Sequence, residues 1–141
     1  MNYTSHMNSA LQQYKKVGTQ SDVATASPHR LILMLLDGAQ EKINLAKGYM
    51  QRGEVALKGN HISWAISIID GLRMSLDRDA GGEIADNLDA LYDYMGRRLA
   101  EANMMNDSGM LDEVNGLLQE IRSAWDAIPD ELRHTTSATA G

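Results

Sequence analysis

Six consecutive apolar residues, 31–36, stand at the start of a predicted helix and constrain the fold more than any other feature. Ser27 can act as the N-cap of this helix, and Pro28 suits its first position, where a missing N–H costs nothing. A single core-facing stripe needs only about three apolar positions in seven. Because six in a row surround the helix, we expect it to be buried on two sides, or covered on its second side by something else.

The composition excludes several classes of protein. The 141 residues suit one domain with a hydrophobic core, and the absence of cysteine rules out disulfides, cysteine-ligated zinc and thiol chemistry. No run of about 18 apolar residues predicts a membrane span, and the N-terminus lacks the pattern of a cleaved signal. The net charge of −6 argues against nucleic acid as a partner. The sequence therefore favours a cytoplasmic protein whose partner, if it has one, is another protein.

Apolar residues at helical spacing predict an all-α fold. Four long amphipathic helices joined by short loops favour an antiparallel up-down four-helix bundle, with a short extra N-terminal helix over 6–17 packed outside it as a lid. The four helices are expected at about 28–52, 55–79, 84–105 and 109–128. We therefore divide the chain into an N-terminal segment, the bundle and a disordered C-terminal tail, at 1–27, 28–128 and 129–141.

Two of the predicted helices carry a second apolar stripe beside the one that faces the core. On the helix at 28–52, the second stripe includes Leu31, Met34 and Leu45, and on the next helix Trp64 and Ile68 are followed by small residues. Three interpretations remain open at this point. The stripes can complete the core, form a homodimer interface, or line a groove that accepts an amphipathic peptide.

No motif in the chain predicts catalysis or a bound metal. Asp77-x-Asp79 begins like a calcium loop, but Leu88 occupies the twelfth position, where such a loop needs a bidentate glutamate. Glu131-x-x-His134 has the spacing of a di-iron ligand pair, but it occurs once and beside the predicted tail. The four histidines do not cluster, and there is neither a nucleophile triad nor a glycine-rich phosphate loop. We therefore expect a protein that is not an enzyme and uses no cofactor.

Two stretches of the chain carry recognisable patterns, Leu33-Met34-Leu35-Leu36-Asp37-Gly38-Ala39 and Gly81-Gly82-Glu83-Ile84-Ala85-Asp86-Asn87-Leu88. Further such stretches lie at 14–16, 23–28, 72–77, 91–95, 102–103, 113–114 and 122–125. In this order and spacing, they resemble the flagellin export chaperone family, FliS. The resemblance spans about residues 7–128, nearly the whole predicted domain.

The resemblance implies a cytoplasmic chaperone that binds the disordered C-terminal segment of newly made flagellin. Members of the family prevent premature polymerisation of flagellin and help deliver it to the flagellar type III export apparatus, so components of the export gate are further candidate partners. The family's N-terminal segment can occupy the binding surface and move away when flagellin arrives. The alternative is a self-associating structural bundle, such as a homodimer, without a flagellin client.

The expected partner-binding residues come from three predicted helices. Tyr14 is expected to anchor the N-terminal segment, with Val17 beside it. The bundle is expected to contribute Leu31, Met34, Leu45, Trp64, Ile68 and Leu72. Two positions depart from the family's pattern, because Leu36 stands where many members have tyrosine and Trp64 stands where a basic residue is common.

Overall fold

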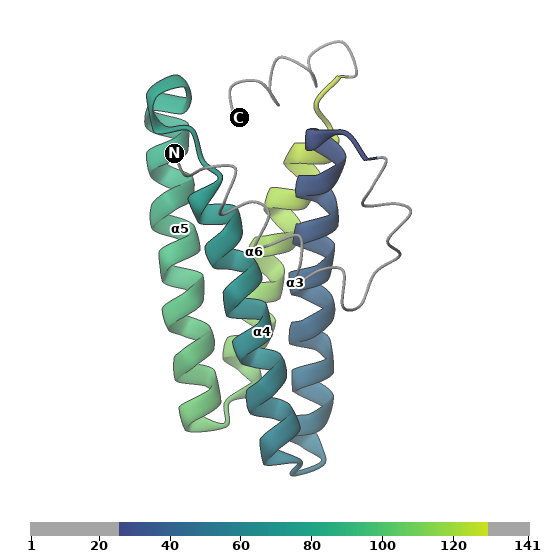
Figure 1. The fold of residues 1–141 in the computed structure, drawn as a ribbon. Helices are drawn as coiled ribbons and strands as arrows, with labels where there is room; N and C mark the ends of the chain where they lie inside the picture. Colours follow the sequence, from purple (N-terminus) through teal and green to yellow (C-terminus); the bar gives the residue numbers. More distant parts are fainter. Residues whose placement is uncertain (1–25, 130–141) are drawn as a thin grey trace.

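The computed structural model of the protein describes residues 26–129, which form four α-helices (Figure 1). Their bounds are Pro28–Gln51 for α3, Val55–Met74 for α4, Arg78–Met105 for α5 and Ser108–Asp126 for α6. No strand occurs within this range, so the predicted all-α fold is confirmed. The predicted lid helix and most of the predicted tail lie outside the described residues and stay predictions.

The four helices form a ring in which each contacts two others. Helix α3 packs against α4 and α6, and α5 packs against the same two helices from the other side (Figure 1). The connections between successive helices are only two or three residues long, which makes successive helices antiparallel. The structure is therefore the predicted up-down bundle.

Side-chain caps fix where three of the helices begin. The Ser27 hydroxyl accepts a hydrogen bond from the backbone N–H of Arg30 at 3.1 Å, which confirms the predicted N-cap of α3. Asp77 caps α5 through the N–H of Ala80, and Asp107 caps α6 through two N–H groups. Each such cap stabilises a helix by about 0.5–2 kcal/mol relative to alanine.

The predicted boundary between the second and third helices of the bundle was wrong. Helix α4 ends at Met74 rather than at 79, and α5 begins at Arg78 rather than at 84. The physical reason is the cap at Asp77, which starts a new helix before the expected glycine break. The break itself exists, because Gly82 has φ +55° and ψ −129° and interrupts the first turns of α5.

The hydrophobic core draws on all four helices. Its fully buried side chains include Leu35 and Ile43 from α3, Ile69 from α4, Leu99 from α5 and Leu118 from α6. The apolar run at 31–36 lies in a helix that is buried on two sides, as its composition predicts. Leu33 and Met34 are buried although they do not belong to the core cluster that contains Leu35 and Leu36, so α3 is covered on two sides.

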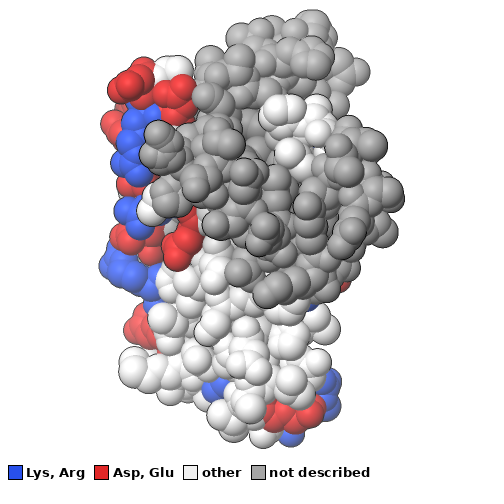
Figure 2. Space-filling model, viewed as in Figure 1, with Lys and Arg blue, Asp and Glu red and all other residues white. Residues whose placement is uncertain are grey.

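Ion pairs connect α5 to its neighbours on the charged side of the molecule. Figure 2 shows Lys, Arg, Asp and Glu side chains alternating along the α5 side. Asp89 accepts hydrogen bonds from Arg73 of α4 at 2.6 Å and from Arg78 at 2.7 Å, and these bonds hold its pKa below the usual range. Arg98 of α5 likewise bonds Glu113 of α6 at 2.7 Å.

Replacing Asp89 with asparagine is expected to lower the free energy of unfolding at pH 7 by about 1 kcal/mol, because it removes the partly buried charge that pairs with both Arg73 and Arg78. The native pKa of Asp89 lies below its unfolded value of about 3.9. The contribution is therefore complete above that value and is lost as the pH falls through the native pKa. The free energies of unfolding in urea should differ between wild type and variant at pH 7, and the difference should shrink as the pH falls through the native pKa.

The exposed Asp86, on the same helix, provides the matched control. Its change to asparagine should leave the free energy of unfolding nearly unchanged at both pH values. If the free energies of unfolding of wild type and the Asp89 variant differed by the same amount at every pH, the carboxylate charge would not contribute to stability.

Candidate functional site

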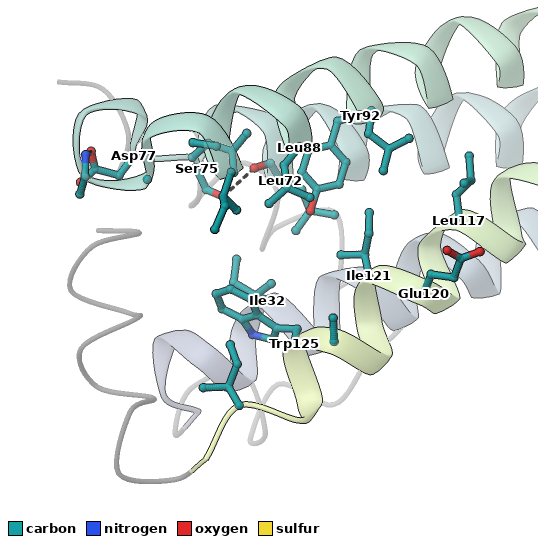
Figure 3. Close-up of a pocket in the computed structure, with 18 residues that line it drawn as sticks. Ile32, Leu72, Ser75, Asp77, Leu88, Tyr92, Leu117, Glu120, Ile121 and Trp125 are labelled. Atoms are coloured by element: carbon teal, nitrogen blue, oxygen red, sulfur yellow. Dashed lines mark hydrogen bonds between the residues drawn. The ribbon is translucent and has the colours of Figure 1, made fainter.

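An apolar cavity of about 610 Å³ opens at the end of the bundle where α4 stops, α5 starts and α6 stops. Figure 3 shows its two walls facing one another. Leu72 of α4 lies on one wall with Leu88 and Tyr92 of α5, whereas Ile121 and Trp125 of α6 lie on the other. Side chains on neighbouring helices therefore fail to meet here, although they close over the core further along the bundle.

The glycine pair at the start of α5 shapes one rim of this cavity. A Cβ atom on Gly81 would lie 2.7 Å from the Cβ of Ala85, a distance at which something must shift. Gly82 has a positive φ that side chains disfavour. Immediately after this bend, Ile84 lines the cavity with 72% of its surface exposed. The bend thus leaves apolar side chains at the rim without a partner in the bundle.

Two hydrogen bonds and a stacking contact between His29 and Trp125 hold the opposite wall of the cavity in place. The His29 Nε2–H donates to the Trp125 carbonyl oxygen at 2.8 Å, and the Trp125 Nε1–H donates to the His29 carbonyl oxygen at 2.9 Å. The two rings are stacked, with centroids 5.0 Å apart and planes 10° from parallel. This reciprocal pair joins the first turn of α3 to the last turn of α6 and fixes the indole at the cavity wall.

The cavity has few polar groups, and apart from the exposed Glu120 carboxylate at its α6 wall they contribute to the fold. The Ser75 hydroxyl donates to the Leu72 carbonyl oxygen at 2.7 Å, and the Asp77 carboxylate caps α5. Burial raises the pKa of the Tyr92 hydroxyl well above its usual value. Within residues 26–129, no group of three or more His, Cys, Asp or Glu side chains is placed to hold a metal ion. The site is therefore suited to binding apolar surface.

The residues predicted to bind a partner divide into three groups. Tyr14 and Val17 lie outside the described residues. Leu45 of α3 is 40% exposed, and Leu31 and Trp64 are half-buried. The buried members are Met34, Ile68 and Leu72, of which the last two belong to the core cluster and Leu72 also lines the cavity. The partner-binding role of all eight residues stays a prediction.

A row of aromatic rings lies between α3 and α4, apart from the cavity. The rings of Tyr49, His61 and Trp64 follow one another, with centroids 4.9 and 5.9 Å apart. We call these three residues the aromatic row. A cation stands over each end, because Arg52 lies 5.0 Å from the Tyr49 ring centroid and the Lys42 Nζ lies 3.9 Å from that of Trp64. Figure 2 shows a largely uncharged face over the lower halves of α3 and α4.

Sequence reasoning missed the contribution of α5 and α6 to the cavity. By their helical spacing, Ile84, Leu88, Ile121 and Trp125 are expected to face the core. The sequence signal that could have indicated the cavity is the Gly81-Gly82 pair directly before an apolar stripe. A bend at that point indicates that the start of the stripe leaves the bundle.

The fold and the cavity together define an all-α four-helix bundle with an open apolar cavity at one end. No described helix is both long enough and apolar enough to cross a membrane. The chain belongs to the flagellar protein FliS family, whose model matches residues 10–132. This membership confirms the resemblance that the sequence motifs indicate.

Relatives from several bacteria match over most of their length. The flagellar secretion chaperone FliS of Vibrio cholerae is 44% identical over 135 residues, which cover 96% of this chain and 99% of the relative. The flagellar secretion chaperone FliSB of Pseudomonas aeruginosa is 50% identical, covering 84% of this chain and 94% of its own. FliS of Salmonella typhimurium is 49% identical, with coverage of 85% and 90%.

Proposed function

We propose that this protein is a cytoplasmic export chaperone that binds the disordered C-terminal segment of flagellin. It prevents premature polymerisation of flagellin, aids delivery to the flagellar type III export apparatus and performs no catalysis. The observation that carries the proposal is the open apolar cavity between α5 and α6. Its relatives' name, flagellar secretion chaperone, supports a flagellar client.

The cavity can act as a substitute partner for an amphipathic client helix. Leu88 and Leu91 on one wall and Leu117 and Ile121 on the other present apolar side chains to the space between them. A segment that folds only on contact with a partner can bury its own apolar residues there. Ordering the client consumes about 2–5 kcal/mol of the contact energy, which keeps the complex reversible enough for transfer to the export apparatus.

Calorimetric titration with the flagellin C-terminal segment from the same organism tests the proposal. Saturable one-to-one binding is expected, with a negative heat-capacity change from apolar burial and a favourable enthalpy from coupled folding. A scrambled peptide of the same composition should give no saturable heat. If the folded protein fails to bind the segment at two temperatures and by a second method, the proposal is wrong.

Deleting residues 1–17 tests the predicted lid. The bundle should remain folded, because the core cluster lies within the described helices, and the affinity for the flagellin segment should stay the same or rise. Thermal unfolding and the same titration measure both effects. A large fall in melting temperature would show that the segment is an integral part of the domain.

The competing function is self-association through exposed apolar side chains. Met104 and Met105 are exposed at the end of α5 that lies away from the cavity, and they favour this alternative. Sedimentation over a wide range of protein concentration separates the two functions. A mass that doubles with concentration, together with no binding of the flagellin segment, would favour the homodimer.

A further inference from the structure

One ionisable carboxylate lines the cavity without a role in the fold. Among the described residues that line it, Asp77 and Glu120 are the acidic ones and none is basic, and the Asp77 carboxylate caps α5. Glu120 lies on the α6 wall next to Leu117 and Ile121 (Figure 3). It is exposed, and no residue within 26–129 forms a hydrogen bond or ion pair with its carboxylate. Within the described part of the chain, the charge of Glu120 is therefore unpaired at the cavity wall.

The helix that carries Glu120 offers it no cation. Side chains on a helix contact those three and four positions away, and a glutamate on a helix surface is commonly stabilised by lysine or arginine at that spacing. For Glu120 these positions hold the uncharged residues Gly116, Leu117, Ser123 and Ala124. Glu120 therefore does not stabilise α6 through an ion pair.

The unpaired charges at the α5 rim of the cavity are also acidic. Asp79, Glu83 and Asp86, in the first turns of α5, are exposed and form no ion pair with a described residue. Figure 2 shows acidic side chains gathered at this end of α5. By contrast, every arginine on α4, α5 and α6 pairs with a carboxylate of the bundle, namely Arg73, Arg78, Arg97, Arg98 and Arg122. The exposed Arg30 of α3 does not line the cavity, so the field at its mouth favours cations.

An apolar cavity with an unpaired carboxylate on its wall specifies the chemistry of the client. An amphipathic helix whose apolar side chains enter the cavity brings its flanking side chains against the α6 wall. Glu120 then loses part of its water, and a carboxylate that loses water without gaining a partner is costly. A lysine or arginine of the client removes that cost, whereas a client carboxylate at the same place adds repulsion. Charge at Glu120 can therefore discriminate between segments that are equally apolar.

We propose that Glu120 pairs with a lysine or arginine of the bound flagellin segment, about one helical turn from the apolar side chains that enter the cavity. The cavity accepts the client's apolar residues, and Glu120 selects the charge that the client carries beside them. The inference rests on the proposed function and uses the same site between α5 and α6. It needs no rearrangement of the bundle, because Glu120 is exposed in this structure.

Glu120→Lys tests the pair, because it reverses the charge at an exposed position and should leave the melting temperature nearly unchanged. Calorimetric titration with the native flagellin segment is expected to show at least about tenfold weaker binding at low salt, and a smaller loss at about 0.5 M salt. Glu120→Gln, which only removes the charge, should weaken binding about threefold.

Glu41→Lys is the matched control for the change in net charge. Glu41 is exposed on α3 and does not line the cavity, so its reversal alters the charge of the protein equally but leaves the site intact. This variant should bind the native segment within about twofold of wild type. If it loses as much affinity as Glu120→Lys, the effect comes from net charge and the inference is wrong.

Flagellin segments in which each Lys or Arg is changed singly to Glu complete a double-mutant cycle. One such segment should bind wild type weakly and should bind Glu120→Lys more tightly than the native segment does. Equal binding of the native segment by wild type and Glu120→Lys would overturn the inference and leave the proposed function intact. A loss that no charge-reversed segment restores would also overturn the inference, because the effect would then come from packing. Failure of wild type to bind any segment would overturn the proposed function as well.

Discussion

Replacing Trp125 with alanine is expected to lower the free energy of unfolding by about 2–3 kcal/mol. The change removes the ring that stacks on His29 and the indole donor to the His29 carbonyl oxygen. These contacts connect the two ends of the chain's described part, the start of α3 and the end of α6. Urea unfolding followed by circular dichroism measures the loss. Binding of the flagellin segment should also weaken, because Trp125 lines the cavity.

Trp125→Phe separates the two parts of this contact. Phenylalanine keeps a ring that can stack on His29 but lacks the N–H donor, so the expected loss is only about 1 kcal/mol. An alanine variant as stable as wild type would contradict the structural role of the His29–Trp125 pair. A phenylalanine variant as unstable as the alanine variant would show that the hydrogen bond, rather than the ring, provides most of the stabilisation.

Local signals in the sequence were sufficient to predict four helices and their order. Ser27-Pro28 marked the start of α3, and the spacing of apolar residues marked the face of each helix toward the core. The junction of α4 and α5 was misplaced because two signals compete there. Gly81-Gly82 is the stronger sign of a break by composition, but Asp77 determines where the new helix begins through its side-chain cap.

The cavity could not be predicted in the same way, because apolar spacing does not show whether neighbouring helices close over a stripe. Ile62 and Ile84 both lie at helical spacing with other apolar residues of their helices, yet Ile62 is 1% exposed and Ile84 is 72% exposed. The difference arises from the bend at Gly82. The His29–Trp125 pair joins residues 96 positions apart, and no local pattern indicates such a contact.

The burial of Lys42 likewise depends on a residue of another helix. In sequence, Lys42 is one of several charged residues on α3, and nothing separates it from Lys47. In the fold, Trp64 of α4 lies against Lys42, whereas Asp112 of α6 pairs with Lys47. The surroundings of these two lysines therefore depend on how α4 and α6 pack against α3, which apolar spacing within one helix does not determine.

Filling the cavity should weaken client binding without unfolding the protein, and Ala124→Trp makes that change. Ala124 is an exposed residue of α6 that lines the cavity, so an indole there can occupy the space proposed for the client's apolar side chains. We expect binding of the flagellin segment to weaken at least about tenfold, which is the scale of losing one central apolar contact. The melting temperature should change little, because no core residue is removed.

Gly116→Trp provides the matched control for this prediction. Gly116 lies on the same helix, its added Cβ would meet no atom within 4 Å, and it does not line the cavity. The same ring at this position should leave the affinity within about twofold, since isolated surface changes have small effects. If both variants bind as wild type does, the client uses a different surface. If only Ala124→Trp binds weakly while both remain folded, the cavity between α5 and α6 is where the flagellin segment binds.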